Sequence, residues 1–203
     1  MAKAKADKKI ISTEEKIREA ARKVFTQKGY AATRTRDIAE AAGINLALLN
    51  YYFRSKEKLF EMIMQEKMQQ FFGIITPVLL DQHTNLNEKI EQVTSKYIDM
   101  LLQNPDMPIF VLSEIRNNTG MFKKMQAGKL LQSSHFVQQL REEQPGVQPL
   151  HFIVSMLGMI IFPFITKPVL QSVGVLNEKG FAAMMEERKQ LLPIWIKSML
   201  GTK

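Results

Sequence analysis

Residues 33–60, TRTRDIAEAAGINLALLNYYFRSKEKLF, decide the fold of this chain. Residue types that start and stop helices recur in this stretch at short intervals. Gly43 can adopt the left-handed backbone that ends a helix, because it has no Cβ. Thr35, Asn45 and Ser55 belong to the types that cap helix N-termini. We therefore predict helices over Arg36 to Ala42, Leu46 to about Phe53, and Lys56 onward.

Helical spacing divides these short helices into buried and exposed faces. The inward stripe comprises Ile38, Ala42, Leu49 and Phe53, and the outward residues of the middle helix are Leu46, Ala47, Asn50 and Tyr51. The outward face is small and uncharged, so it can approach base edges in a DNA major groove, where asparagine pairs with adenine. Tyrosine and lysine suit phosphate groups, which predicts a positioning role for Tyr51, Tyr52, Lys56 and Lys58.

The positive charge of the chain is concentrated in the same region. The 203 residues carry a net charge of +8, and residues 1–60 hold 14 Lys/Arg against 7 Asp/Glu. The remaining 143 residues hold 14 against 13. A basic surface next to helices of this kind favours nucleic-acid binding, through the release of counterions from DNA. An ordinary solvated basic surface is the alternative.

Composition also excludes several classes of protein. The chain has no cysteine, which removes disulfide frameworks, thiolate chemistry and the common zinc ribbons. Residues 1–10 predict a basic flexible arm without the apolar run of a signal peptide, so we expect a cytoplasmic protein. The apolar run over 152–165 is too short to span a membrane, since a span needs about 20 residues. We interpret it as a helix buried in a core or an interface.

The whole chain predicts an all-α protein of about nine helices, with no alternating strand pattern. Besides the three helices above, of which the third extends to about Phe72, the expected helices cover 13–29, 87–103, 109–117, 121–142, 150–165 and 178–200, with a kink at Pro193. This pattern divides the chain into an arm over 1–10, a helix-turn-helix domain over 11–71 with its motif at about 34–53, and a helical domain over 72–203.

The stretch from Thr13 to Phe72 resembles the TetR/AcrR family of bacterial transcriptional regulators. The resemblance lies in AARKVFTQKGY, in T-x-T-x-DIAEAAG at residues 33–43, and in Asn45, Leu49, Tyr51 to Phe53, Ser55 and Lys56. It implies a homodimer with two DNA-binding heads, and a C-terminal helical body that holds an effector pocket and the dimer interface. The chain departs from the family at Leu48, often a small residue there, and at Asn50, often tyrosine.

The resemblance and the pattern together give three sets of candidate residues. The DNA-binding set is Arg34, Thr35, Arg36, Asn45, Leu46, Ala47, Asn50, Tyr51, Tyr52, Lys56 and Lys58. The effector-pocket set is Met64, Met68, Phe71, Phe72, Tyr97, Met100, Leu101, Phe110, Glu114, Met121 and Met125, for which simple core packing is the alternative. The dimer-interface set is Phe152, Met156, Met159, Ile160, Met184, Arg188, Leu191 and Trp195, for which burial in a monomeric core is the alternative.

These observations favour a DNA-binding regulator that a small apolar or amphipathic effector releases from a near-palindromic operator, most simply a repressor. We expect no enzyme activity, cofactor or metal site, because no nucleophile constellation or phosphate loop is present. His83, His135 and His151 lack metal-ligand spacing. The alternatives are a constitutive DNA-binding regulator without a ligand, and a hydrophobic-ligand carrier or enzyme with an incidental helix-turn-helix.

Overall fold

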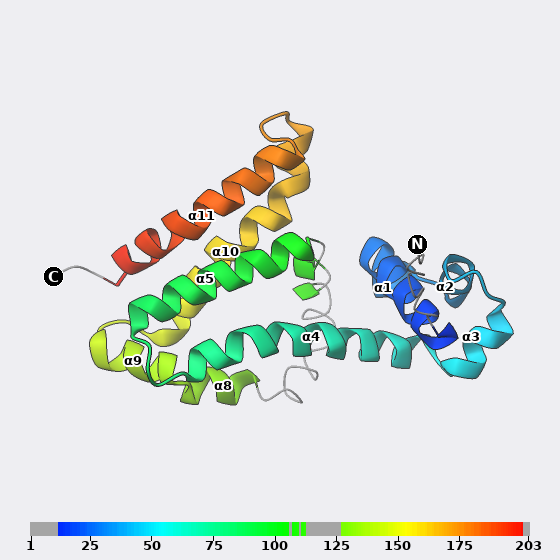
Figure 1. The fold of residues 1–203 in the computed structure, drawn as a ribbon, viewed down its shortest axis with the longest axis horizontal. Coiled ribbons are helices and arrows are strands. Elements are labelled where there is room, and N and C mark those ends of the chain that lie inside the picture. Colours follow the sequence, from blue (N-terminus) through cyan, green and yellow to red (C-terminus); the bar gives the residue numbers. More distant parts are fainter. Residues whose placement is uncertain (1–11, 106, 110, 113–126, 201–203) are drawn as a thin grey trace, which may run out of the picture. The chain divides into compact units, whose positions relative to one another are not determined.

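The computed structural model describes residues 12–105, 107–109, 111–112 and 127–200, and these residues contain helices and no strand. The all-α prediction is therefore confirmed. The chain forms two compact units, one up to Met68 and the other from Gln69 onward, and α4 (Lys56–Leu80) runs through both (Figure 1). The predicted arm over 1–10, residues 110 and 113–117 of the helix predicted over 109–117, and the first part of the helix predicted over 121–142 lie outside the described residues.

The N-terminal unit, called the head below, packs three helices against the first part of α4. These are α1 (Thr13–Ala32), α2 (Thr35–Ala41) and α3 (Leu46–Tyr52). Its core contains an aromatic group, in which the ring centroids of Phe25 and Phe60 lie 4.9 Å apart and those of Tyr30 and Phe60 lie 4.7 Å apart. Burial of such rings is a large favourable contribution to the folding of a small unit.

An ion-pair cluster also links α1 to α4 within the head. The Glu66 carboxylate accepts from Arg22 Nη2 at 2.8 Å and from Arg18 Nη1 at 3.3 Å. Arg18 and Arg22 pair in addition with Glu14 and Glu15, one turn or two turns away on α1 itself. Because these side chains are partly exposed, the cluster contributes to orientation more than to stability.

The helix boundaries in the head differ from the sequence prediction at two places. The predicted Thr35 cap is wrong, because Thr35 is the first residue of α2 and the Arg34 N–H donates to the Asp37 carboxylate at 2.9 Å instead. Gly29 does break the regular backbone of α1, with a φ of 74°, but the chain returns to a helical turn that ends at Ala32. An acidic side chain in the first turn caps α2 as well as a hydroxyl would.

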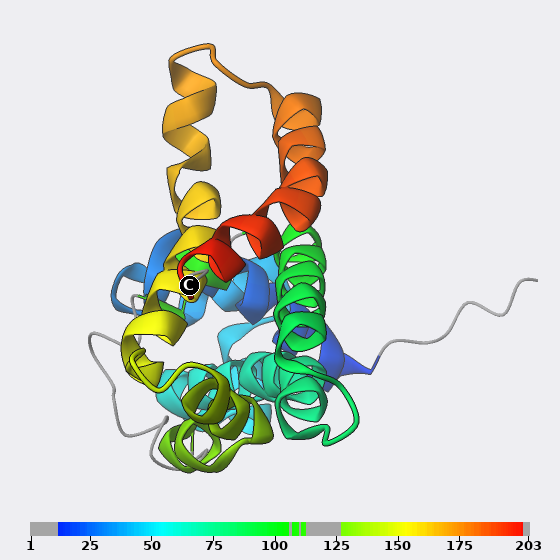
Figure 2. The same ribbon diagram turned by 90° about the vertical axis from the view of Figure 1, so that its left-hand side faces the viewer.

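The C-terminal unit, called the body below, is built around α5 (Leu86–Gln103). Around it lie α8 (Ala127–Ser133), α9 (His135–Glu143), α10 (Pro149–Ser172), α11 (Glu178–Ser198) and the end of α4. Helices α5 and α11 lie side by side (Figure 1), and Lys189 and Lys197 of α11 pair with Asp99 and Glu91 of α5. Figure 2 shows α10 and α11 as the two arms of one hairpin.

Three helix ends in the body were predicted wrongly. Helix α4 continues past Gly73 and Pro77 to Leu80, and α10 continues past Ile165 through Pro168 to Ser172. The helix predicted over 121–142 is divided at Ser134, whose hydroxyl caps α9. In α4 and α10 a local break signal lost to tertiary packing, since one glycine or proline costs a helix only about 1–3 kcal/mol.

The prolines in α10 leave carbonyl groups that other side chains must satisfy. Because Pro163 has no N–H, the carbonyl of Met159 has no helical donor four residues later. Arg188 Nη2 of α11 donates to this carbonyl at 2.8 Å. The guanidinium is half-buried, lies over the Trp195 ring, and has its pKa lowered by burial. Arg188 therefore fastens the α10–α11 hairpin at the proline.

By length and composition, α10 passes the criteria for a membrane-spanning helix, with 24 residues and a mean hydropathy of 1.9 in its most apolar window. The helix is therefore longer than the apolar run over 152–165 on which the sequence argument rested, and one such helix is weak evidence for a membrane span. Five of its apolar side chains are nevertheless buried in the body: Phe152, Ile153, Met156, Ile160 and Phe164. One side of α10 therefore belongs to the core of the body, whereas most of the helix is not buried within the chain.

The connection between α4 and α5 is held by a buried lysine. Lys89 has no exposed surface, and its ammonium donates to the carbonyl and hydroxyl of Thr84 at 2.5 and 3.1 Å. His135 Nδ1 of α9 lies 3.3 Å from this ammonium and 2.9 Å from the carbonyl oxygen of Asp81. Burial lowers the pKa of Lys89. The histidine and the lysine together fix α9 to the start of α5.

Gly43 gives the fold a direct test. Its φ of 66° lies in the left-handed region and a Cβ there would meet nothing within 4 Å, so only backbone strain opposes a side chain. We expect Gly43→Ala to lower the free energy of unfolding of the head by about 1–2 kcal/mol. Urea denaturation followed by circular dichroism measures this change. The control is Gly73→Ala in α4, which has equal space and no positive φ, and should be neutral or stabilising. Equal stability of both variants would contradict the strain.

Candidate nucleic-acid interface

The turn between α2 and α3 sets the direction of α3. Gly43 and Ile44 donate their N–H groups to the carbonyls of Glu40 and Ala39, each at 3.0 Å, which closes α2 in a tight turn. Asn45 then caps α3, since its Oδ1 accepts from the Leu48 N–H at 2.8 Å. The predicted cap at Asn45 and the predicted turn at Gly43 are both confirmed.

Helix α3 has one buried and one exposed face, as its spacing predicts. Leu49 is only 1% exposed and Phe53 is also buried, so these two side chains anchor the helix to the head. Tyr51 is 80% exposed, and Ala47 and Asn50 are exposed beside it. Ala42, which was predicted to face inward, is only half-buried, and Ala39 of α2 is buried instead.

Exposed tyrosines and cations border this face. The rings of Tyr51 and Tyr52 stand edge to face with their centroids 5.4 Å apart, and both side chains are exposed. Arg34 and Arg36 are exposed at the start of α2, and Thr35 between them is half-buried. The pKa of Asp37 is held below its usual value by the Arg34 N–H. Asp37 also pairs with Lys28 at 3.3 Å, so the negative charge of this carboxylate is balanced by a cation of the protein.

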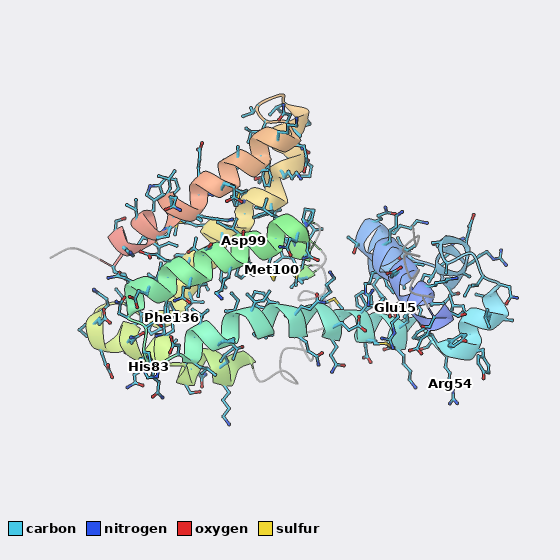
Figure 3. The ribbon with its side chains drawn as sticks, viewed as in Figure 1. Glu15, Arg54, His83, Asp99, Met100 and Phe136 are labelled. Carbon is cyan, nitrogen blue, oxygen red and sulfur yellow. The ribbon has the colours of Figure 1, made fainter. Side chains whose placement is uncertain are left out.

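Sequence reasoning missed one cation of this surface. Arg54 follows α3 directly, is exposed, and points away from the helices in Figure 3. It was left out of the predicted set although it stands between two predicted helices, next to Tyr52 and Phe53. An arginine in the connection between two helices, outside the apolar pattern of both, could have indicated this candidate for a phosphate contact.

The two lysines predicted to bind phosphate lie in different environments. Lys58 is exposed on the first turn of α4. The ammonium of Lys56 instead donates to the carbonyls of Tyr30 and Thr33, both at 2.9 Å, and lies 4.2 Å from the centre of the Tyr30 ring. The contacts of the two lysines therefore do not support the prediction that both bind phosphate in the same way.

The predicted effector-pocket residues are distributed over both units. Met64 and Met68 are buried in the head, whereas Tyr97, Met100 and Leu101 are buried in the body on α5. Phe71 brings part of the set together, with its ring 5.0 Å from that of Tyr97 and 5.1 Å from that of Phe72. Burial raises the pKa of Tyr97. The other predicted pocket residues, which are Phe110, Glu114, Met121 and Met125, lie outside the described residues.

The predicted dimer-interface residues fall into two groups. Phe152, Met156 and Ile160 are buried in the core of the chain itself, and Met159 and Met184 are partly buried against that core. Arg188 bonds to α10 within the chain. Leu191 and Trp195 are exposed, and so are other large apolar side chains of α10, of α11 and of the residue that follows α11: Leu150, Val154, Phe162, Val169, Ile194 and Met199.

On each of the two helices, helical spacing places the exposed apolar residues on one side. On α10, Leu150 and Val154 are one turn apart, and Gly158 and Phe162 follow at the same interval. On α11, Leu191, Ile194 and Trp195 occupy neighbouring turns. These exposed apolar sides of α10 and α11 are together called the hairpin face below.

Among the described residues, no group of three or more His, Asp or Glu side chains is arranged to hold a metal ion.

Comparisons with known proteins agree with this geometry. Residues 17–63, which cover most of the head, match the family model described as "Bacterial regulatory proteins, tetR family". The chain is 25% identical over 201 residues to the "Probable HTH-type transcriptional regulator YttP" of Bacillus subtilis, a match that covers 95% of this chain and 96% of that protein.

Two further matches are a regulator named for fatty acid metabolism and a regulator solved with stearoyl-CoA. The "Fatty acid metabolism regulator protein" of Bacillus subtilis is 28% identical over 102 residues, covering 50% of this chain and 52% of that protein. The solved structure of the regulator FadR from Bacillus subtilis, in complex with stearoyl-CoA, superposes with a TM-score of 0.63. It is 20% identical and covers 87% of this chain and 96% of that one, so it bears on the fold.

Proposed function

Because this chain belongs to the TetR family of bacterial transcriptional regulators, we propose that it is a cytoplasmic repressor that binds a near-palindromic operator as a homodimer. A small apolar or amphipathic effector releases it from the DNA. The observation that carries this proposal is the exposed face of α3, where Ala47, Asn50 and Tyr51 stand on a helix held from behind by Leu49.

This face has the properties that a major groove requires. A helix reaches base edges only if its outward side chains are short near its N-terminus, which Ala47 satisfies. Asn50 can donate to and accept from an adenine, the pairing that the amide group makes best. Tyr51, Tyr52, Arg34, Arg36, Arg54 and Lys58 surround the face, and we assign them to phosphates.

The hairpin face supports the proposed homodimer. Large apolar side chains are exposed on both helices of the hairpin, and exposed apolar side chains that gather on one part of a protein mark interaction sites. We assign α10 and α11 to a four-helix interface with a second copy, whose two-fold symmetry brings the same face of each copy together. Two recognition helices then meet half-sites about 34–36 Å apart, or a multiple of that.

Aromatic side chains of the body support the proposal of an apolar effector. Phe71, Phe72 and Tyr97 form an aromatic cluster on α4 and α5, and α4 carries its N-terminal part into the head. A ligand that binds here and shifts α4 changes the separation of the two heads. It lowers operator affinity only if it binds the non-binding arrangement more tightly. Relatives named for fatty acid metabolism make a fatty acyl-CoA the first candidate.

The proposed reading face predicts two different mutant behaviours. Asn50→Ala should change the preference among operator sequences, because a bidentate base contact discriminates by about 1–3 kcal/mol. Tyr51→Phe should weaken binding to all sequences alike, by about 0.5–1.5 kcal/mol for one lost hydrogen bond. Gel shifts on the DNA that flanks the gene of this protein, with single-base operator variants, measure both effects. An unchanged sequence preference in Asn50→Ala would remove its base-reading role.

The proposed interface predicts that one charge on the hairpin face separates the dimer. Phe162→Glu should give a folded monomer with lower operator affinity, because a carboxylate in an apolar interface loses its hydration. Sedimentation equilibrium measures the mass. The control is Leu80→Glu, which changes an apolar side chain at the end of α4 that is 48% exposed, against 62% for Phe162, and this variant should stay dimeric. A monomeric unmodified protein, or a dimeric Phe162→Glu variant, would contradict the interface.

The proposed effector class is tested with stearoyl-CoA as the probe. We expect micromolar stearoyl-CoA to release the protein from operator DNA, whereas coenzyme A without an acyl chain should not, since the apolar chain supplies the binding energy. Fluorescence anisotropy of labelled operator DNA follows the release. If neither acyl-CoAs nor other apolar compounds bind the protein, the constitutive regulator is the better description.

A further inference from the structure

The ammonium group of Lys56 occupies a prepared position inside the head. Lys56 is the first residue of α4, and its Nζ donates to the carbonyl oxygens of Tyr30 and Thr33, each at 2.9 Å. The same Nζ lies 4.2 Å from the centre of the Tyr30 ring, within the range of a cation–π interaction. Two of the three N–H donors of the ammonium are thus used within the protein.

The backbone around Tyr30 explains why a cation is favoured there. The last carbonyls of a helix have no intrahelical donor, and a positive charge near them is favourable. After the left-handed Gly29, the Thr33 hydroxyl donates to the Gly29 carbonyl at 2.7 Å. The Arg34 N–H is directed forward to Asp37. The last turn of α1 contains no basic residue of its own, so Lys56 supplies the charge from α4.

The position of these carbonyls gives the contact a role in DNA binding. Residues 30–33 connect α1 to Arg34 and α2, and α2 carries α3 through the Gly43 turn. Lys56 therefore joins the start of α4 to the segment that orients the two helices of the reading unit. To reach a phosphate, its ammonium would have to give up one or both carbonyl bonds, whereas the exposed Lys58 has no such competition.

We infer that Lys56 is a positioning residue for DNA binding, which holds α2 and α3 in their binding orientation from α4, and that the phosphate contacts belong to its neighbours such as Lys58. This inference rests on the proposed DNA-binding function. It differs from the role that family resemblance implies for Lys56, which is direct contact with the operator.

The dependence of operator affinity on salt separates the two roles. Each phosphate neutralised by a side chain adds about 0.9 to the slope of log affinity against log salt concentration. Lys58→Gln should lower this slope by about 1, as expected for a phosphate contact. Lys56→Gln should lower the affinity about tenfold at every salt concentration and leave the slope unchanged. Fluorescence anisotropy of labelled operator DNA, at salt concentrations from about 50 to about 300 mM, measures this slope.

The folded state is checked by circular dichroism, and Lys56→Arg decides the matter if Lys56→Gln does not fold. A guanidinium replaces an ammonium well at a phosphate but does not fit between two fixed carbonyls. We expect Lys56→Arg to lose affinity at an unchanged slope. A slope reduced by about 1 in Lys56→Gln, or wild-type affinity in either Lys56 variant, would overturn the inference. Failure of the unmodified protein to bind operator DNA would instead contradict the proposed function itself.

Discussion

The burial of Leu49 of α3 in the core of the head is the interaction on which the rest of the proposed function depends. A seven-residue helix such as α3 is too short to be stable alone, so its orientation comes from the side chains that it buries. Leu49 is buried because Gly43 turns the chain and Asn45 starts the helix at the right phase. With Leu49 inside, helical geometry leaves Ala47, Asn50 and Tyr51 outside.

The local part of this arrangement could be predicted from the sequence, and the tertiary part could not. The turn at Gly43 and the caps at Asn45 and Ser55 depend on residues within a few positions of one another. The predicted breaks in α4 and α10 failed because proline and glycine costs are small beside the packing of a long helix. The role of Arg188 follows from a carbonyl that Pro163 leaves without a donor, which no spacing rule shows.

The candidate site divides in the same way. Tyr51 and Asn50 were predicted as exposed from helical phase alone, and they are exposed. Phe152, Met156 and Ile160 share the spacing of an interface but are buried within the chain, because periodicity does not tell one kind of burial from the other. Lys56 was placed among the phosphate contacts, and its bonds to Tyr30 and Thr33 come from a segment more than twenty residues away.

The central claim, that the α3 side of the head lies on DNA, is tested most directly by affinity cleavage. The chain has no cysteine, so Glu57→Cys beside α3 and Glu187→Cys on α11 each give one attachment point for an iron chelate. With operator DNA, the Glu57 conjugate should cleave in two clusters related by the operator symmetry, about one helical turn or a multiple apart. The Glu187 conjugate should not cleave. Cleavage from Glu187 without cleavage from Glu57 would contradict the account.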